Sequence, residues 1–295
     1  MRQNVLVHDR ITKRDVPPRR VWDLYANRVV PYWVVDRDTS LSPCGISHAW
    51  VDGKDRVDAI TPINQREWPV PMPKDANLDL IRIEMLNHVW PSGAQYAWLD
   101  VLCLRQEGGE GEHLRLDEWK LDVPTIGAVY NTSGSQVVCY FSGLGRPLHL
   151  TSDYFESDRC WFRRAWTLQE VRQYAITGGE TDNNVMEEEL RRRCSERLAS
   201  LAILQVYGSI FDLVSEMRTR VSTKPLDKVA GLVYLFKTES IPVYHAERSE
   251  ADAWEVLMDV MSSWYRAQLL FFYFEPGGGS KFWRPSWDQV MTKKI

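Results

Sequence analysis

The clearest strand in this sequence is Tyr96-Ala97-Trp98-Leu99-Asp100-Val101-Leu102-Cys103-Leu104, a run that is apolar except for one aspartate. Two shorter runs of the same kind are Cys44-Gly45-Ile46-Ser47-His48-Ala49-Trp50 and Val137-Val138-Cys139-Tyr140-Phe141. Short apolar runs bounded by turn residues are typical of buried strands. Helical patterns separate the three runs, so the sequence predicts an α/β fold with a mostly parallel sheet flanked by helices.

The helices around these strands are predicted from the spacing of apolar residues. Leu78, Ile81, Met85 and Val89 mark one helix, and a second runs through Trp119 to Tyr130, where Pro124 either starts or kinks it. We expect a further helix over 161–172. Residues 53–75 hold four prolines and no sustained period, which favours a long irregular loop.

The second half of the chain has a different pattern. A helical stretch over 186–220 is expected to break near Gly208, another helix covers 251–266, and Leu269 to Phe274 reads as a late strand. We therefore divide the chain into a peripheral N-terminal arm (1–42), an α/β core (43–180) and a helical extension with that late strand (181–295). Within the arm, the apolar patch 29–35 contains Pro31, which suits an edge strand or a strap.

Composition excludes several classes of function. The chain has 295 residues, a net charge of −4 and a pI near 5.9, so it lacks the basic surface that nucleic-acid binding needs. It has no apolar run of roughly 20 residues and no signal-peptide pattern, so we expect a cytoplasmic protein with no membrane partner. Its five cysteines are widely spaced and are read as reduced thiols, and no motif predicts a metal site.

The segment Trp161-Phe162-Arg163-Arg164-Ala165-Trp166-Thr167-Leu168-Gln169-Glu170 carries the strongest chemical signal. On a helix, Trp166 and Glu170 share a face because they are four positions apart. A glutamate beside an indole is partly desolvated, and a neighbouring arginine can keep it ionised, so Glu170 is a candidate catalytic carboxylate. The alternative is a structural carboxylate paired with Arg163 or Arg164, with Trp166 packing in the core.

Other polar residues near the strand ends have two readings each. Asp100, within its apolar run, either caps backbone amides and holds Arg105 or contacts a substrate, since a buried carboxylate needs a partner. His48 and Cys103 invite a thiol-nucleophile reading. We disfavour it because Cys103 has apolar neighbours and a buried thiol is usually inert.

Four segments together resemble the fungal heterokaryon-incompatibility (HET) domain, most closely its basidiomycete-type forms. They are Ile46–Trp50, Tyr96–Gln106, Trp161–Glu170 and Asp227–Leu232, in the order that the family has them. The second and third are the most specific. With a weaker element at Pro285-Ser286-Trp287, the resemblance covers roughly residues 40 to 290.

This resemblance implies a fold similar to Toll/interleukin-receptor (TIR) domains, which are flavodoxin-like, and a role in fungal self/non-self recognition that ends in cell death. TIR domains that cleave NAD carry a Trp-x-x-x-Glu element with a catalytic glutamate, and Trp166 to Glu170 looks like it. The resemblance thus implies an NAD glycohydrolase with NAD as substrate and no cofactor. It also implies that self-association supports activity and that an upstream receptor triggers it.

The fold implied by the resemblance places the site where the strand ends converge. Ser47 to Trp50 close the first strand, Asp100 to Gln106 close the second, and Glu170 faces them. Trp50 or Trp166 would stack on a ring, and Arg105 or Arg164 would bind pyrophosphate. The candidate site is therefore Glu170 as catalytic residue, with Ser47, Trp50, Asp100, Arg105, Arg164 and Trp166 binding the substrate.

Two features depart from the family. Leu104-Arg105-Gln106 stands where many HET domains have Ile-Asn-Gln, and the proline-rich stretch 61–73 has no TIR equivalent. Both would reshape a pocket. A second hypothesis therefore stays open, namely a non-enzymatic, TIR-like signalling or adaptor module that acts by self-association.

Overall fold

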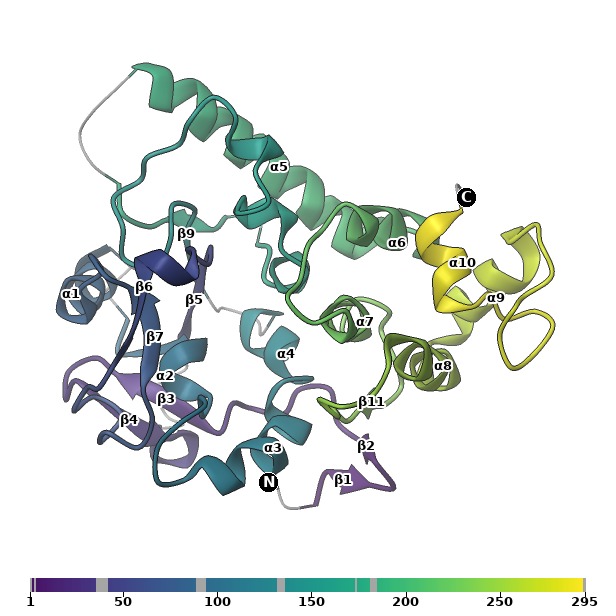
Figure 1. Ribbon diagram of the computed structural model, residues 1–295, viewed down its shortest axis with the longest axis horizontal. Coiled ribbons are helices and arrows are strands. Elements are labelled where there is room, and N and C mark those ends of the chain that lie inside the picture. Colours follow the sequence, from purple (N-terminus) through teal and green to yellow (C-terminus); the bar gives the residue numbers. More distant parts are fainter. Residues whose placement is uncertain are drawn as a thin grey trace.

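The computed structural model describes residues 2, 4–35, 42–88, 94–131, 136–172, 174–180 and 185–293. Its centre is a six-stranded mixed sheet in the order β10-β9-β5-β8-β3-β4. Four adjacent strands run parallel to one another: β5 (Cys44–His48), β8 (Tyr96–Leu99), β9 (Val137–Tyr140) and β10 (Ile176–Thr177). The prediction of an α/β fold with a sheet flanked by helices is confirmed at this level (Figure 1).

The N-terminal segment contributes two strands to the central sheet. The hairpin β3 (Arg20–Asp23) and β4 (Arg28–Pro31) pairs antiparallel to β8 and places β4 at the edge, as Pro31 predicts. The remainder of this segment forms β1 (Leu6–Val7) and β2 (Arg10–Ile11), which join β11 (Ile241–Pro242) in a small second sheet.

The predicted irregular loop over 53–75 is wrong. This segment contains a short 3-10 turn, η2 (Gly53–Asp55), and a β-hairpin of β6 (Arg56–Ala59) and β7 (Val70–Pro73). β7 tolerates Pro71 and Pro73 because this two-stranded sheet gives it one hydrogen-bonded neighbour, so its other edge needs no N–H donors. Trp68 anchors the hairpin: its side chain is buried and its Nε1 donates to the carbonyl of Val101 over 3.2 Å.

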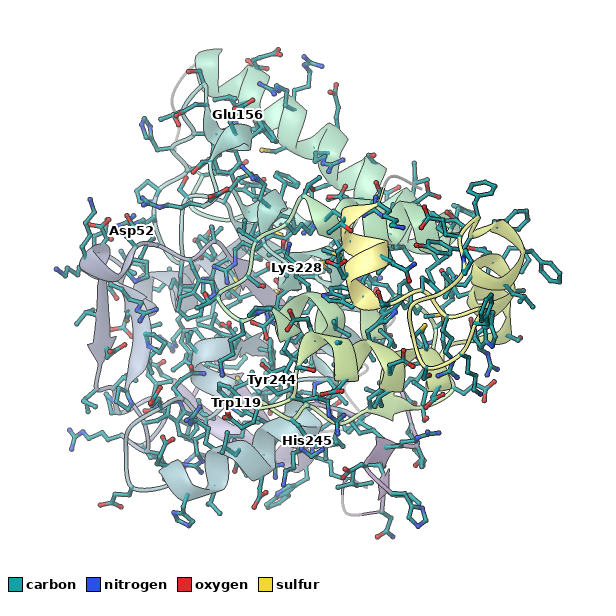
Figure 2. All side chains as sticks on the ribbon, turned by 45° about the vertical axis from the view of Figure 1, so that its right-hand side comes forward. Asp52, Trp119, Glu156, Lys228, Tyr244 and His245 are labelled. Carbon is teal, nitrogen blue, oxygen red and sulfur yellow. The ribbon has the colours of Figure 1, made fainter. Side chains whose placement is uncertain are left out.

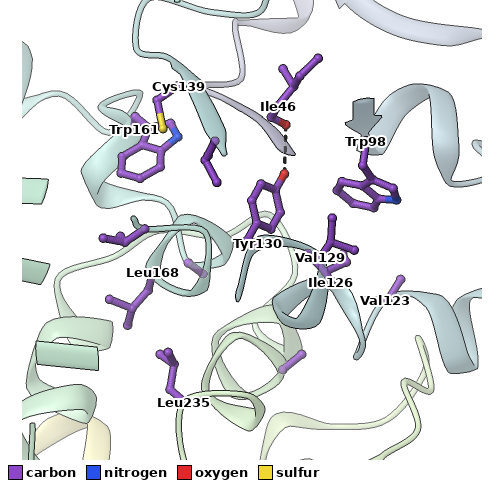
Figure 3. Close-up of a cluster of buried hydrophobic side chains, with 14 of the residues drawn as sticks. Ile46, Trp98, Val123, Ile126, Val129, Tyr130, Cys139, Trp161, Leu168 and Leu235 are labelled. Carbon is purple, nitrogen blue, oxygen red and sulfur yellow. Dashed lines mark hydrogen bonds between the residues drawn. The ribbon is translucent and has the colours of Figure 1, made fainter. Parts of the chain in front are cut away.

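The helices of the first half match the apolar spacing. α1 (Leu78–His88) is the first of them, although the predicted Val89 lies outside the described residues. Pro124 separates α3 (Glu112–Asp122) from α4 (Ile126–Asn131). α4 covers one face of β5, where the ring of Tyr130 lies over Gly45 and its hydroxyl donates to the carbonyl of Ile46 over 3.0 Å (Figure 3).

The second half is mainly helical. α5 (Val185–Tyr207) and α6 (Ile210–Arg218) meet at Gly208, as predicted, and α7 (Leu226–Val233) packs against α8 (Glu250–Val260). α9 (Ser263–Phe272) and α10 (Trp287–Thr292) lie farthest from the sheet (Figure 1). None of the helices in the described part of the chain combines the length and apolar character needed to cross a bilayer.

Two predictions about the second half are wrong. The expected helix over 251–266 is two helices that break at Met261 and Ser262. The expected late strand over 269–274 belongs mostly to α9, and its apolar side chains Leu270, Phe271 and Phe272 are exposed rather than buried. An apolar run therefore misled the strand prediction, because burial and not composition defines a core strand.

Candidate functional site

A cavity of about 580 Å³ opens at the carboxyl ends of β5 and β8. Ligands of open α/β sheets bind beyond the carboxyl ends of the strands, and 300–1,000 Å³ is roughly the usual size of small-molecule sites. Residues between 46 and 130 and between 164 and 170 supply most of the lining, and Lys224, Asp227 and Tyr244 of the helical second half complete it. Trp119 and Tyr244, whose rings are 6.5 Å apart, mark this junction in Figure 2.

Glu170 lies in the inner part of the cavity and is held by a chain of hydrogen bonds. Trp161 Nε1 donates to Ser47 Oγ over 2.7 Å, and Ser47 Oγ donates to Glu170 Oε2. Burial raises the pKa of Glu170 to about 7, although the Ser47 hydrogen bond acts in the opposite direction. A carboxyl that titrates near neutrality in a cavity is a mark of a functional group.

His48 and Asp100 form an ionisable pair beside Glu170. His48 Nε2 is 3.0 Å from Asp100 Oδ1, and His48 Nδ1 is 3.2 Å from the carbonyl of Ala49. Burial favours the neutral form of Asp100, but His48, the Val101 amide and Arg164 outweigh it, so its pKa falls below the usual range. The cavity therefore contains two carboxyls with pKa values shifted in opposite directions.

Asp100 owes its position to a change of secondary structure. The predicted strand 96–104 ends at Leu99, and α2 (Asp100–Cys103) begins at once. The Asp100 carboxylate accepts from the Val101 amide over 2.8 Å, which satisfies a free N–H of the first helical turn. The prediction that Asp100 lies inside a strand is therefore wrong. Its two predicted roles are not exclusive, because Asp100 both caps a backbone amide and lines the cavity.

Arg164 brings a cation to the same cavity. Its guanidinium carbon lies 5.5 Å from the centroid of the Trp50 ring. Burial lowers the pKa of Arg164 to about 10, and Glu170, Asp100 and Asp227 act against this shift. Within the described ranges, its guanidinium makes no ion pair at 4 Å or less with any of these carboxylates.

The predicted helix over 161–172 is wrong in a way that matters for the site. Two 3-10 turns, η4 (Trp161–Arg163) and η5 (Trp166–Gln169), replace it, and Arg164 between them is extended. Two backbone hydrogen bonds join this segment to Val221: Ala165 N donates to Val221 O over 2.9 Å, and Val221 N donates to Arg163 O. A continuous α-helix would need those same backbone groups.

A buried arginine fixes the segment from behind. Arg220 has a side chain with 0% exposure and donates to Arg164 O over 2.7 Å and to Thr167 Oγ1 over 2.9 Å. Its charge is balanced by Glu216 at 3.1 Å. The turn that carries Trp166 and Glu170 is thus positioned by tertiary contacts and not by helix propensity.

Aromatic rings form much of the apolar lining. They are Trp50, Trp98, Trp119, Trp166, Tyr130 and Tyr244. Tyr244 also donates a 2.9 Å hydrogen bond to Asp227 Oδ1, and its ring lies 6.4 Å from that of Trp166. Burial raises the pKa of Asp227, so this carboxyl, like that of Glu170 and unlike that of Asp100, is shifted toward the neutral form.

The structure brings six of the seven sequence-predicted site residues to this cavity: Ser47, Trp50, Asp100, Arg164, Trp166 and Glu170. Arg105 does not line it. Its side chain is buried elsewhere, 3.0 Å from Glu67 and 3.4 Å from Glu118, with its guanidinium over the Trp68 ring. Because the chain enters α2 at Asp100, the neighbours Leu104 and Gln106 line the cavity while Arg105 does not.

Sequence reasoning missed several lining residues. Arg56 belongs to the unpredicted hairpin, and Lys224, Asp227 and Tyr244 come from the second half. Asp227 opens the fourth segment of the family resemblance, which was the available signal. No pattern in the sequence indicated that Tyr244 or Lys224 would line the cavity.

Cysteine and metal chemistry receive no support from the site. Cys103 does not line the cavity, and burial raises the pKa of its thiol to about 12, so the nucleophilic thiolate is not formed near neutrality. Among the described residues, no group of three or more His, Cys, Asp or Glu side chains could hold a metal ion.

Comparison with known proteins gave no match to a family model, to a curated protein or to a solved structure.

Proposed function

We propose that this protein cleaves NAD at the nicotinamide–ribose bond, with Glu170 as the catalytic carboxylate, in a HET-type cell-death effector of TIR-like fold. The observation that carries the proposal is the position of Glu170: it lies in an aromatic cavity at the strand ends, fixed by Ser47 and Trp161. The resemblance of Trp166 to Glu170 to the catalytic element of TIR enzymes supports the same assignment.

The strand order supports the TIR-like part of the proposal. In chain order the parallel strands are β5, β8, β9 and β10, and in the sheet they run β8-β5-β9-β10. This is the 2-1-3-4 arrangement of flavodoxin-like sheets. Ser47 lies on β5, beside the point where the order reverses.

The chemistry needs a carboxylate near the ribose. When the bond breaks, its electron pair stays on the nicotinamide nitrogen, and the ribose carbon passes through an oxocarbenium-like state that an ionised Glu170 stabilises. Water then adds to that carbon and releases one proton, giving ADP-ribose and neutral nicotinamide. The Asp100–His48 pair lines the cavity and is the candidate acceptor of that proton.

The aromatic lining suits the two flat rings of NAD. Trp166 is half-buried and lines the cavity, as stacking on a base or on nicotinamide requires. Trp50 is half-buried as well, but Arg56 and Arg164 already lie over its ring. Cationic nicotinamide would also favour the ionised form of Glu170, because an opposite charge nearby lowers a carboxyl pKa.

The test is nicotinamide release from NAD over a protein concentration series, comparing the wild type with Glu170→Gln. We expect release that disappears in the variant while its circular dichroism spectrum is unchanged. Concentration is varied because self-association is part of the proposal. Undiminished release by Glu170→Gln would refute the assignment, and no release by the wild type at any concentration would favour the adaptor hypothesis.

A further inference from the structure

The cavity that contains Glu170 also has three cationic side chains in its wall. Arg56 comes from β6, Arg164 from the extended residue between η4 and η5, and Lys224 from the segment before α7. Three segments that are far apart in sequence thus direct positive charge to one cavity. The same lining also contains four carboxylates, those of Asp52, Asp100, Glu170 and Asp227, which offset part of the repulsion between the cations.

Glu170, Asp100 and Asp227 attract Arg164 through space, and Asp227 also attracts Lys224, but these attractions are not direct ion pairs. In the part of the chain that the structure describes, the side chains of Arg56, Arg164 and Lys224 form no ion pair at 4 Å or less. By contrast, Arg105, Arg220 and Arg284 each pair with a carboxylate. Among the described residues, Arg14 and Arg82 also donate to backbone carbonyls without a carboxylate partner, so the distinguishing feature of the cavity is that three such cations line it together.

Arg56 and Arg164 converge on one ring. Both guanidinium carbons lie 5.5 Å from the Trp50 ring centroid. Arginine over an indole is held by the ring quadrupole, which leaves its N–H groups free for an anion. Trp50 therefore orients two guanidinium groups without consuming their hydrogen-bonding capacity.

Arg56 and Lys224 are more exposed than Glu170, whereas Arg164 is half-buried like Glu170 itself. Ser47 and His48 beside Glu170 are 1% and 7% exposed, whereas Arg56 and Lys224 are exposed although they line the cavity. Exposed lining residues belong to its mouth. A bound molecule would thus place a negative group at the mouth and a sugar near Glu170.

We infer that Arg56, Arg164 and Lys224 form a diphosphate-binding site, with Arg56 and Lys224 at the mouth of the cavity and Arg164 more deeply buried. Planar guanidinium groups bind phosphate oxygens through two parallel hydrogen bonds, and a lysine adds a point charge. The inference rests on the proposed function, because the diphosphate group that we place here is the one that joins the two nucleoside halves of NAD. It adds Arg56 and Lys224 as specificity residues of that reaction.

The binding test uses inorganic pyrophosphate and ADP-ribose, titrated calorimetrically into the full chain. We expect Arg56→Gln and Lys224→Gln each to weaken both ligands by roughly tenfold or more, as loss of a charged hydrogen bond does. Lys54→Gln is the matched control, because Lys54 is exposed two residues from Arg56 and does not line the cavity. Its affinity should equal that of the wild type.

A kinetic arm separates this inference from the proposed function. Arg56→Gln should raise KM for NAD and leave KM for nicotinamide riboside, which has no phosphate, unchanged. If Glu170→Gln abolishes cleavage but Arg56→Gln and Lys224→Gln bind pyrophosphate and ADP-ribose like the wild type, the inference fails alone. If both variants lose these ligands while the wild type never releases nicotinamide, the diphosphate site stands and the proposed function fails.

Discussion

Ser47 donates a hydrogen bond to Glu170 across 123 positions of sequence, and the same hydroxyl accepts from the indole of Trp161. The first of these contacts joins β5 to the turn after η5. It favours the ionised form of a carboxyl that burial otherwise drives toward neutrality. The serine therefore sets both the orientation and the charge of Glu170.

Replacing Ser47 by alanine should shift the pH dependence of nicotinamide release. The pKa of Glu170 is about 7 with the hydrogen bond in place, and its loss should raise it further, by roughly one unit for a bond to a charged group. Because the proposed reaction requires ionised Glu170, the pH at which kcat/KM rises should be higher in this variant than in the wild type. The measurement is kcat/KM from pH 5 to 9, with Ser47→Thr, which keeps a hydroxyl, as control. An unchanged acid limb would contradict the role given to Ser47.

Replacing Glu170 by glutamine should stabilise the protein at high pH. The folded-state pKa, about 7, exceeds the ordinary value of 4.5, so the folded state favours the protonated carboxyl. Its ionisation costs stability as pH rises from 4.5 through 7, and the full cost, on the order of 3 kcal/mol, applies above that range. The Tm gain of Glu170→Gln should therefore be small at pH 5 and large at pH 8. Exposed Glu110→Gln is the control, and a gain independent of pH would exclude this origin.

Replacing Arg220 by methionine should destabilise the fold and impair the site together. The variant leaves Glu216 with Arg197 as its partner and removes the donors to Arg164 O and Thr167 Oγ1. A loss on the order of 3 kcal/mol is expected for breaking a buried pair, measured by urea unfolding. Arg192→Met, which breaks exposed pairs with Glu189 and Glu196, should cost less than about 1 kcal/mol. Equal losses of stability in the two variants would show that the buried contacts of Arg220 contribute no more than exposed ion pairs do.

Replacing Gly45 by alanine should destabilise the sheet–helix contact. A Cβ atom at this position would lie 2.8 Å from Cδ1 and Cε1 of Tyr130, so the ring must move and its hydrogen bond to Ile46 weakens. Such overpacking typically costs about 1–3 kcal/mol, measured by urea unfolding. At Gly53 the same substitution meets no atom within 4 Å and should be nearly neutral. A neutral Gly45→Ala would mean that Tyr130 adapts without cost.

The parts of the fold that the sequence predicts are those in which burial and local pattern agree. β5, β8 and β9 are short apolar runs and fully buried, and α5 and α6 break at Gly208 where the pattern breaks. The hairpin of β6 and β7 was missed because its prolines suggested a loop, whereas a two-stranded sheet with a free edge accommodates them.

The candidate site was predicted for residues next to strand ends and for the segment from Arg164 to Glu170, and it was missed elsewhere. Ser47 and Asp100 follow from strand ends. Glu170 was identified by its spacing from Trp166, although the α-helix on which that argument relied is absent. Arg105 was misplaced because nothing local shows that the strand stops at Leu99 and that a helical turn redirects the next residues. Tyr244 and Lys224 depend on how the second half folds back, which is tertiary information.

The hairpin of β6 and β7 shares no hydrogen-bonded ladder with the central sheet, yet it contributes Arg56 to the cavity. Glu170, by contrast, depends on contacts that tie β5, Trp161 and Arg220 together, so few substitutions around it can be neutral. If the proposed function holds, reactivity and ligand preference reside in parts of the chain with different tolerance to substitution. Exchange of this hairpin between related chains would then change which ligand the cavity admits and would leave the position of Glu170 unchanged.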